Sequence, residues 1–127
     1  MPVQTELNLR LPNSPGALAQ VCELLAAERI SVLAIALEAS GHLRLVVDNT
    51  MRAIGVLTEE RHRVSQTQVL TTLVRDSAQD IAAVLRLAAD AGVNVEYVYS
   101  GVSPNPDRVE LVIGTADPLR AATLSGL

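Results

Sequence analysis

The segment Asn13–Leu18 contains the residue types that can bind an anion at the start of a helix. Asn13 and Ser14 have short side-chain oxygens that can cap a first helical turn, and Pro15 suits the first helical position. Gly16 lacks a Cβ, so the backbone there can lie close to a ligand or to another chain. The free N–H groups and the dipole of a helix start favour a carboxylate. The alternative interpretation is an ordinary capped strand-to-helix turn.

The remaining residues that could bind a metal or take part in catalysis do not form a recognisable motif. His42 and His62 have no Cys or other His at metal-ligand spacing, so the sequence predicts no metal site. Cys22 falls on the apolar stripe of a predicted helix, where a thiol behaves as a small apolar group. The chain contains no P-loop and no Gly-x-Gly-x-x-Gly motif. We therefore expect no catalytic residues, no enzymatic activity and no cofactor.

Composition narrows the function classes further. The 127 residues are 49% hydrophobic, yet Tyr97 and Tyr99 are the only aromatic residues, so the core must be aliphatic. The net charge is −4 and the basic residues are scattered, which argues against nucleic-acid binding. No apolar run reaches the roughly 18 residues of a membrane span, and no signal peptide is visible. These features, with a single Cys, predict a cytoplasmic protein that does not bind membranes.

The elements that position Asn13–Leu18 follow from hydrophobic periodicity. Alternation predicts a strand over Val3–Leu11, with Leu7, Leu9 and Leu11 on the apolar face and Glu6, Asn8 and Arg10 on the other. The next expected element is a helix that ends at about Glu28. It is followed by a pair of strands and then by a second helix, which is capped by Asp48, Asn49 or Thr50. Met51, Ile54 and Leu57 or Val56 are its expected inner positions, and Gly55 is expected to shorten it or make it irregular. The expected strand pair is Ile30–Leu37 and Leu43–Val47.

The pattern then repeats at a spacing of 63 residues, which takes Leu18 to Ile81 and Val21 to Val84. The segment 61–74 is too long for one typical strand, so we expect it to close the first unit and open the second. Further expected elements are a helix capped by Ser77 and ended by Gly92, strands Val93–Tyr99 and Arg108–Ile113, and a short helix from Asp117-Pro118. This order predicts an α+β fold, the ferredoxin-like βαββαβ unit repeated twice, with antiparallel sheets and helices on one face. The units span 1–67 and 68–127, and the second is truncated because it lacks a clear closing strand.

The whole chain resembles the ACT domain, a small regulatory ligand-binding module. The resemblance is carried by the strand, the turn and the amphipathic helix in this order, and by the duplication. The residues that carry it are Asn13, Pro15, Gly16, Ala17, Leu18, Ala19 and Val21, then 24–26, 30–32 and 91–100. It implies that the turn binds an amino acid or a related small effector, that two modules meet near the site, and that the chain forms a homodimer.

The resemblance carries over a site residue by residue. Backbone N–H groups of the turn would hold the ligand carboxylate, Asn13 would pair with its amino group, and Leu18 would pack beneath. The complete set is Asn13, Ser14, Pro15, Gly16, Ala17 and Leu18. In the second copy Ala78 and Gln79 replace the Pro-Gly pair, so one site per chain is expected rather than two. Asp76, Ser77, Tyr97 and Tyr99 are further candidates, with packing at an edge or interface as the alternative for the two tyrosines.

The leading hypothesis is a non-enzymatic sensor that binds an amino acid and alters an assembly or a separate metabolic enzyme. The chain shows no catalytic domain that it could regulate within the same polypeptide. One alternative is a structural oligomerisation module in which the turn is only a cap. The other is a small ferredoxin-like enzyme or metal binder. A ligand screen and a metal analysis distinguish the three hypotheses.

Overall fold

The computed structural model describes residues 1–123 and divides the chain into two compact units. One unit is Thr5–Thr67, and the other joins Met1–Gln4 to the described residues from Gln68 onward. The end of the second predicted unit, residues 124–127, lies outside the described residues. The strands are β1 (Val3–Arg10), β2 (Val32–Leu37), β3 (His42–Val47), β4 (Ser65–Arg75), β5 (Tyr97–Gly101) and β6 (Arg108–Gly114), and the helices are α1 (Ala17–Ala27), α2 (Thr50–Glu59), α3 (Ala78–Asp90) and α4 (Pro118–Ala122).

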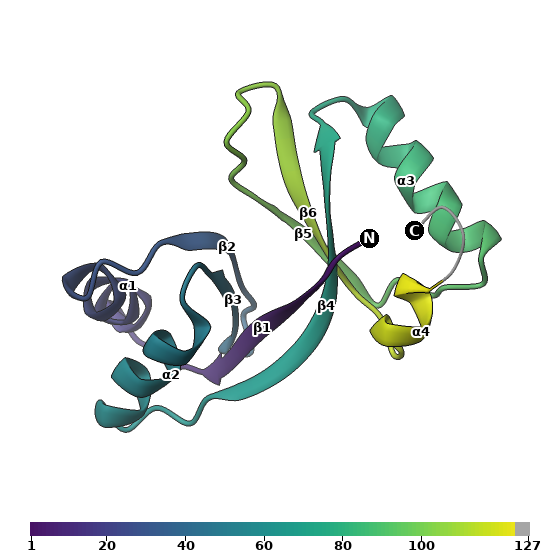
Figure 1. Ribbon diagram of the computed structural model, residues 1–127. Coiled ribbons are helices and arrows are strands. Elements are labelled where there is room, and N and C mark those ends of the chain that lie inside the picture. Colours follow the sequence, from purple (N-terminus) through teal and green to yellow (C-terminus); the bar gives the residue numbers. More distant parts are fainter. Residues whose placement is uncertain (124–127) are drawn as a thin grey trace. The chain divides into compact units, whose positions relative to one another are not determined.

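In the unit Thr5–Thr67, β3 pairs antiparallel with both β1 and β2. Helices α1 and α2 pack against one face of these strands (Figure 1). The apolar periodicity of β1 and α1 was predicted correctly, because Leu7, Leu9, Val21 and Leu25 are buried together. The rest of this core is aliphatic as well: Leu11, Ile30, Leu43, Leu45, Val47, Ala53 and Leu57.

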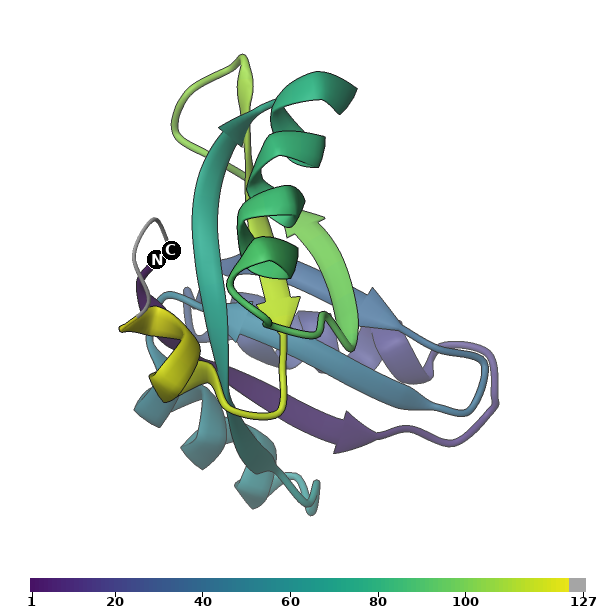
Figure 2. The same cartoon turned by 90° about the vertical axis from the view of Figure 1, so that its right-hand side faces the viewer.

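In the unit that contains β4, strand β6 pairs antiparallel with both β4 and β5. Helix α3 lies against these strands (Figure 2), and its apolar stripe of Ile81, Val84 and Leu85 packs, partly buried, against their core. Strand β5 begins at Tyr97, later than the predicted Val93, because the N–H of Val93 still donates to the carbonyl oxygen of Ala88 in α3, at 2.9 Å.

Side-chain capping explains where three of the four described helices begin. Asn49 Oδ1 accepts a hydrogen bond from the N–H of Arg52, Ser77 Oγ from Asp80, and Asp117 Oδ1 from Arg120, at 3.0–3.2 Å. The Ser77 cap was predicted, Asn49 was one of three candidates for the cap of α2, and Asp117-Pro118 was predicted to start the last helix.

The inner face of α2 was predicted only in part. Leu57 is buried, and Ile54 and Val56 pack, partly buried, against the same core, as predicted. Met51 is 74% exposed, and Ala53 is buried although it was not predicted to be. The helix is neither short nor irregular, because Gly55 sits within its ten residues without ending it.

The predicted fold class is wrong in its strand organisation. We expected two ferredoxin-like βαββαβ copies in antiparallel sheets, the second truncated. The described residues instead form six strands in one closed antiparallel order, β1-β3-β2-β5-β6-β4, with four helices. The reason is that β4 is one continuous strand of 11 residues where we expected two strands. Both halves therefore have the same order, β1-α1-β2-β3-α2 and β4-α3-β5-β6-α4, so the second copy is not truncated relative to the first.

Candidate functional site

A cavity of about 380 Å³ lies at the turn between β1 and α1, and we call it the turn cavity. Five of the six predicted turn residues line it, and Pro15 does not. The opposite wall comes from the end of β2 and the β2–β3 hairpin, so the whole cavity belongs to the unit Thr5–Thr67. Its lining consists of Leu11, Pro12, Asn13, Ser14, Gly16, Ala17, Leu18, Ala19, Leu37, Glu38, Ala39 and Gly41.

Helix α1 begins without a side-chain cap, unlike the other described helices. Its N-cap is Gly16, and neither the side chain of Asn13 nor that of Ser14 accepts a hydrogen bond from the first turn. The N–H of Ala17 donates instead to the backbone carbonyl oxygen of Ser14 at 3.4 Å. The predicted capping role of Asn13 or Ser14 is therefore wrong, and Pro15 precedes the N-cap instead of occupying the first helical position. The reason is that Gly16 adopts the left-handed conformation with φ 84°, which starts the helix later than expected. The first-turn N–H groups of α1 therefore have no side-chain acceptor, and the residues that carry them, Ala17, Leu18 and Ala19, line the turn cavity.

Glycine is required at position 16 for its conformation rather than for close packing. A Cβ built there would meet nothing within 4 Å, so open space lies beside this residue. Residues with a Cβ rarely adopt the positive φ of Gly16, because it is sterically unfavourable for them.

Gly41 brings the hairpin close to the end of β1. Its carbonyl oxygen accepts a hydrogen bond from the N–H of Leu11 at 2.8 Å, and its φ is 92°. A Cβ at this position would collide with the carbonyl oxygen of Leu11. The sequence indicated a turn at Ser40-Gly41 but not its role in shaping a cavity. A glycine in the turn between two apolar strands was the only available signal.

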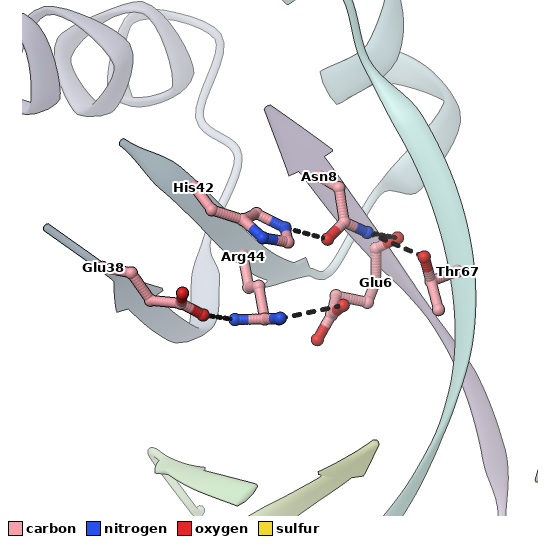
Figure 3. Close-up of polar contacts among 6 residues, drawn as sticks. All are labelled: Glu6, Asn8, Glu38, His42, Arg44 and Thr67. Carbon is pink, nitrogen blue, oxygen red and sulfur yellow. Dashed lines mark hydrogen bonds and ion pairs between the residues drawn. The ribbon is translucent and has the colours of Figure 1, made fainter. Parts of the chain in front are cut away.

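Glu38 is the one charged residue in the described lining of the turn cavity. Its carboxylate accepts a hydrogen bond from Nη1 of Arg44 (Figure 3). This hydrogen bond and the positive charge of Arg44 hold the pKa of Glu38 below its ordinary value of 4.5, so the carboxylate is ionised at neutral pH. The turn cavity therefore combines backbone N–H donors on one wall with a carboxylate on another. Sequence reasoning missed Glu38, because nothing before folding places the end of β2 beside the β1–α1 turn.

The second unit has a cavity of about 410 Å³ in the corresponding place. Leu9 and Leu37 both pair with Leu43, as Thr72 and Ser100 both pair with Leu111. The 63-residue spacing therefore holds for the two outer strands, whereas the paired leucines of the central strands are 68 residues apart. The lining is more apolar and consists of Asp76, Ile81, Leu85, Val98, Tyr99, Ser100, Val109 and Leu111.

The four further candidates are distributed unevenly around that second cavity. Asp76 and Tyr99 line it, Ser77 caps α3, and Tyr97 lies outside the lining. The rings of Tyr97 and Tyr99 stack with centroids 6.3 Å apart, as expected for residues two apart on one strand. Ser77 Oγ already accepts a hydrogen bond from the N–H of Asp80. The start of α3 therefore has fewer free N–H donors for an anion than the start of α1.

Residues 1–123 contain no group of three His, Cys, Asp or Glu side chains that could hold a metal ion. The described helices also include none with the length and apolar character needed to cross a membrane.

Comparisons with known proteins match nearly the whole chain. The most similar structures include protein BT0572 from Bacteroides thetaiotaomicron, 30% identical with a TM-score of 0.81 over 94% of this chain and 84% of that one. The regulatory subunit of aspartate kinase from Thermus thermophilus is 17% identical, with a TM-score of 0.65 over 94% and 89%. E. coli aspartokinase III in complex with lysine and aspartate is 20% identical, with a TM-score of 0.59 over 94% and 29%. The comparison with curated proteins found no match.

The similarity to the two aspartate kinase structures shows a shared fold only. The family is shown by the match of the sequence to a family model. The family model of the ACT domain pair matches residues 1–123, and the chain therefore belongs to the ACT domain pair family.

Proposed function

We propose that this protein is a non-enzymatic sensor that binds an amino acid in the turn cavity of the unit Thr5–Thr67. The observation that carries the proposal is the pairing of an uncapped helix start with an ionised Glu38 around one cavity. An amino acid has a carboxylate and an ammonium group, and these match the two walls. The volume of about 380 Å³ lies within the roughly 300–1,000 Å³ range of small-molecule sites.

In this proposal the ligand carboxylate accepts hydrogen bonds from the first-turn N–H groups of α1, and its ammonium group lies toward Glu38. Asn13 lines the same cavity and can add a polar contact. The apolar walls, which include Leu37 and Leu18, would contact the side chain of the ligand. Lysine and aspartate are the first candidates to test, because they are the ligands in the E. coli aspartokinase III structure.

A sensor also needs two states that the ligand distinguishes, because binding shifts an equilibrium only through differential affinity. We propose that the chain forms a homodimer and that the ligand changes this assembly or its contact with a separate metabolic enzyme. Sedimentation of the protein with and without ligand tests the first part. An assembly that is unchanged at saturating ligand would leave only regulation of a separate protein.

A thermal-shift screen with the twenty amino acids tests ligand binding. A ligand at 100 times its Kd should stabilise the protein by about 2.7 kcal/mol. The variant Gly16→Leu introduces a side chain at the cavity wall and should abolish the response. Gly92→Leu is a matched control, because Gly92 also has a positive φ and open space beside it but lines a different cavity. A response that survives in Gly16→Leu, or a flat response of the wild-type protein to all twenty, would contradict the proposal.

A further inference from the structure

A second cavity in the unit Thr5–Thr67, of about 480 Å³, has a different chemistry from the turn cavity. It lies where the end of β1, the start of β3 and the segment leading into β4 meet, and it shares no lining residue with the turn cavity. We call it the arginine cavity, and its lining consists of Asn8, Leu9, Arg10, His42, Arg63, Val64, Ser65 and Thr67.

The charge of the arginine cavity is positive although the chain carries a net charge of −4. Two guanidinium groups and one imidazole line it, and its described lining contains no carboxylate. Arg10 donates from Nη1 to the carbonyl oxygen of Ser40 at 3.0 Å, which leaves its charge unneutralised by that contact. Arg63 makes no ion pair among residues 1–123. Arg10 and His42 are only minor causes of the lowered pKa of Glu38, because its carboxylate forms an ion pair with Arg44. Glu38 therefore does not pair with the basic residues of the arginine cavity.

Hydrogen bonds among the polar residues of this cavity fix which of their groups can still donate. Asn8 Nδ2 donates to Oγ1 of Thr67 at 2.9 Å, so Asn8 Oδ1 faces Nε2 of His42 at 2.7 Å (Figure 3). This orientation assigns the proton to Nε2 of His42. Because the Thr67 oxygen accepts from Asn8, its own O–H hydrogen remains available to donate. Ser65 supplies a second hydroxyl donor to the cavity.

We propose that the arginine cavity binds the phosphoryl group of a small phosphorylated molecule. Guanidinium groups present planar forks of N–H donors that match phosphate oxygens bidentately. Two such groups, two hydroxyl donors and the lack of a described carboxylate in the lining form a set that suits a dianion with several oxygens. This site is independent of the proposed amino-acid site, so the protein would respond to two ligands of different charge.

The test is an NMR titration of the full-length, ¹⁵N-labelled protein with inorganic phosphate at constant ionic strength. Saturable shifts are expected for the amides of residues 8–10, 42 and 63–67, and none for residues 14–19. Arg63→Gln should weaken phosphate binding about tenfold or more, because it removes a charge-assisted hydrogen bond. Arg86→Gln is the matched control, because Arg86 is an exposed residue of α3 whose Nη1 lies 3.7 Å from Oδ1 of Asp90. It should leave the affinity unchanged.

Three results would overturn the proposal: no saturable shifts at millimolar phosphate, the same shifts with chloride, or equal weakening by Arg63→Gln and Arg86→Gln. Succinate that binds as tightly as phosphate would overturn the phosphoryl assignment in favour of a dicarboxylate. Because the amides of residues 14–19 report separately on the turn cavity, failure at one site is distinguishable from failure at the other.

Discussion

The Nε atom of Arg44 lies 3.8 Å from Oε1 of Glu6, whose side chain is completely buried. The other end of the same guanidinium contacts Glu38 at the rim of the turn cavity (Figure 3). Arg44, with 14% of its side chain exposed, thus links the buried side chain of Glu6 to Glu38 in the lining of the turn cavity. The framework of the unit Thr5–Thr67 and its candidate site share this residue.

Replacing Arg44 should therefore destabilise the protein strongly. Arg44→Met removes the guanidinium that faces buried Glu6, and breaking such a pair costs about 3 kcal/mol or more. Arg52→Met is the control, because Arg52 and Glu28 are 55% and 44% exposed and an exposed pair contributes about 0–1 kcal/mol. Urea unfolding measures both. The double variant Arg44→Met/Glu6→Gln should recover part of the loss, and equal losses in both single variants would contradict the prediction.

The pKa of Glu38 gives a prediction for acid conditions. Its folded-state pKa is lowered from 4.5, chiefly by the hydrogen bond from Arg44 and then by the charge of Arg44. A lowered pKa means that the ion pair stabilises the fold above about pH 4.5 and that this contribution disappears as the pH falls through the folded-state pKa. An NMR titration of the side-chain carboxyl should show the lowered value. In Arg44→Met it should return toward 4.5, and an unchanged titration in that variant would show that another group sets it.

Two glycine-to-alanine changes should have opposite signs. Gly41→Ala forces a Cβ against the carbonyl oxygen of Leu11 at a positive φ, so we expect a loss of about 2 kcal/mol or more. Gly55→Ala places a Cβ in open space in the middle of α2, where Ala is favoured over Gly by about 0.5–1 kcal/mol. Thermal unfolding of the two variants measures the difference. A stabilised Gly41→Ala would mean that the hairpin is not held against β1.

A carboxylate in the first turn of α1 should separate folding from ligand binding. Ala19 is the third residue of α1, is exposed and lines the turn cavity. Ala19→Glu should stabilise the helix by about 0.3–1 kcal/mol through its dipole while competing with the ligand carboxylate. An amino acid identified in the screen should bind this variant more weakly and Ala19→Gln nearly normally.

The position 63 residues later provides a charge control for this prediction. Ala82→Glu adds the same charge in the other unit, at an exposed position on α3 outside the turn cavity. It should leave the affinity unchanged in calorimetry. If Ala19→Glu binds as tightly as the wild-type protein, the carboxylate of the ligand does not lie at this helix start.

Hydrophobic periodicity and cap residues were sufficient to predict most elements. The apolar face of β1, the stripe of α1 and the caps Asn49, Ser77 and Asp117 all follow from local rules that act within a few residues. The division of 61–74 into two strands failed, because strand length alone does not reveal that a single strand serves both halves of the chain.

The site was predictable on one wall only. The β1–α1 turn was predicted to be the site because its residue types are distinctive, and its residues do line a cavity. The opposite wall, including Glu38 and Gly41, depends on the pairing of β2 with β3 and on the contact of the hairpin with Leu11. The burial of Glu6 was also beyond sequence rules, since alternation places it on the polar face of β1.

The first four residues belong to the same unit as the residues from Gln68 onward, and this has a consequence for the order of folding during translation. The N–H of Thr71 donates to the carbonyl oxygen of Pro2 at 3.0 Å, and both residues belong to the unit that contains β4. The ribosome must synthesise all of Thr5–Thr67 before this bond can form, so the segment Met1–Gln4 has to wait for its partner strand. Contacts between residues so distant in sequence slow folding. A nascent chain arrested before β4 would therefore hold its first residues unpaired.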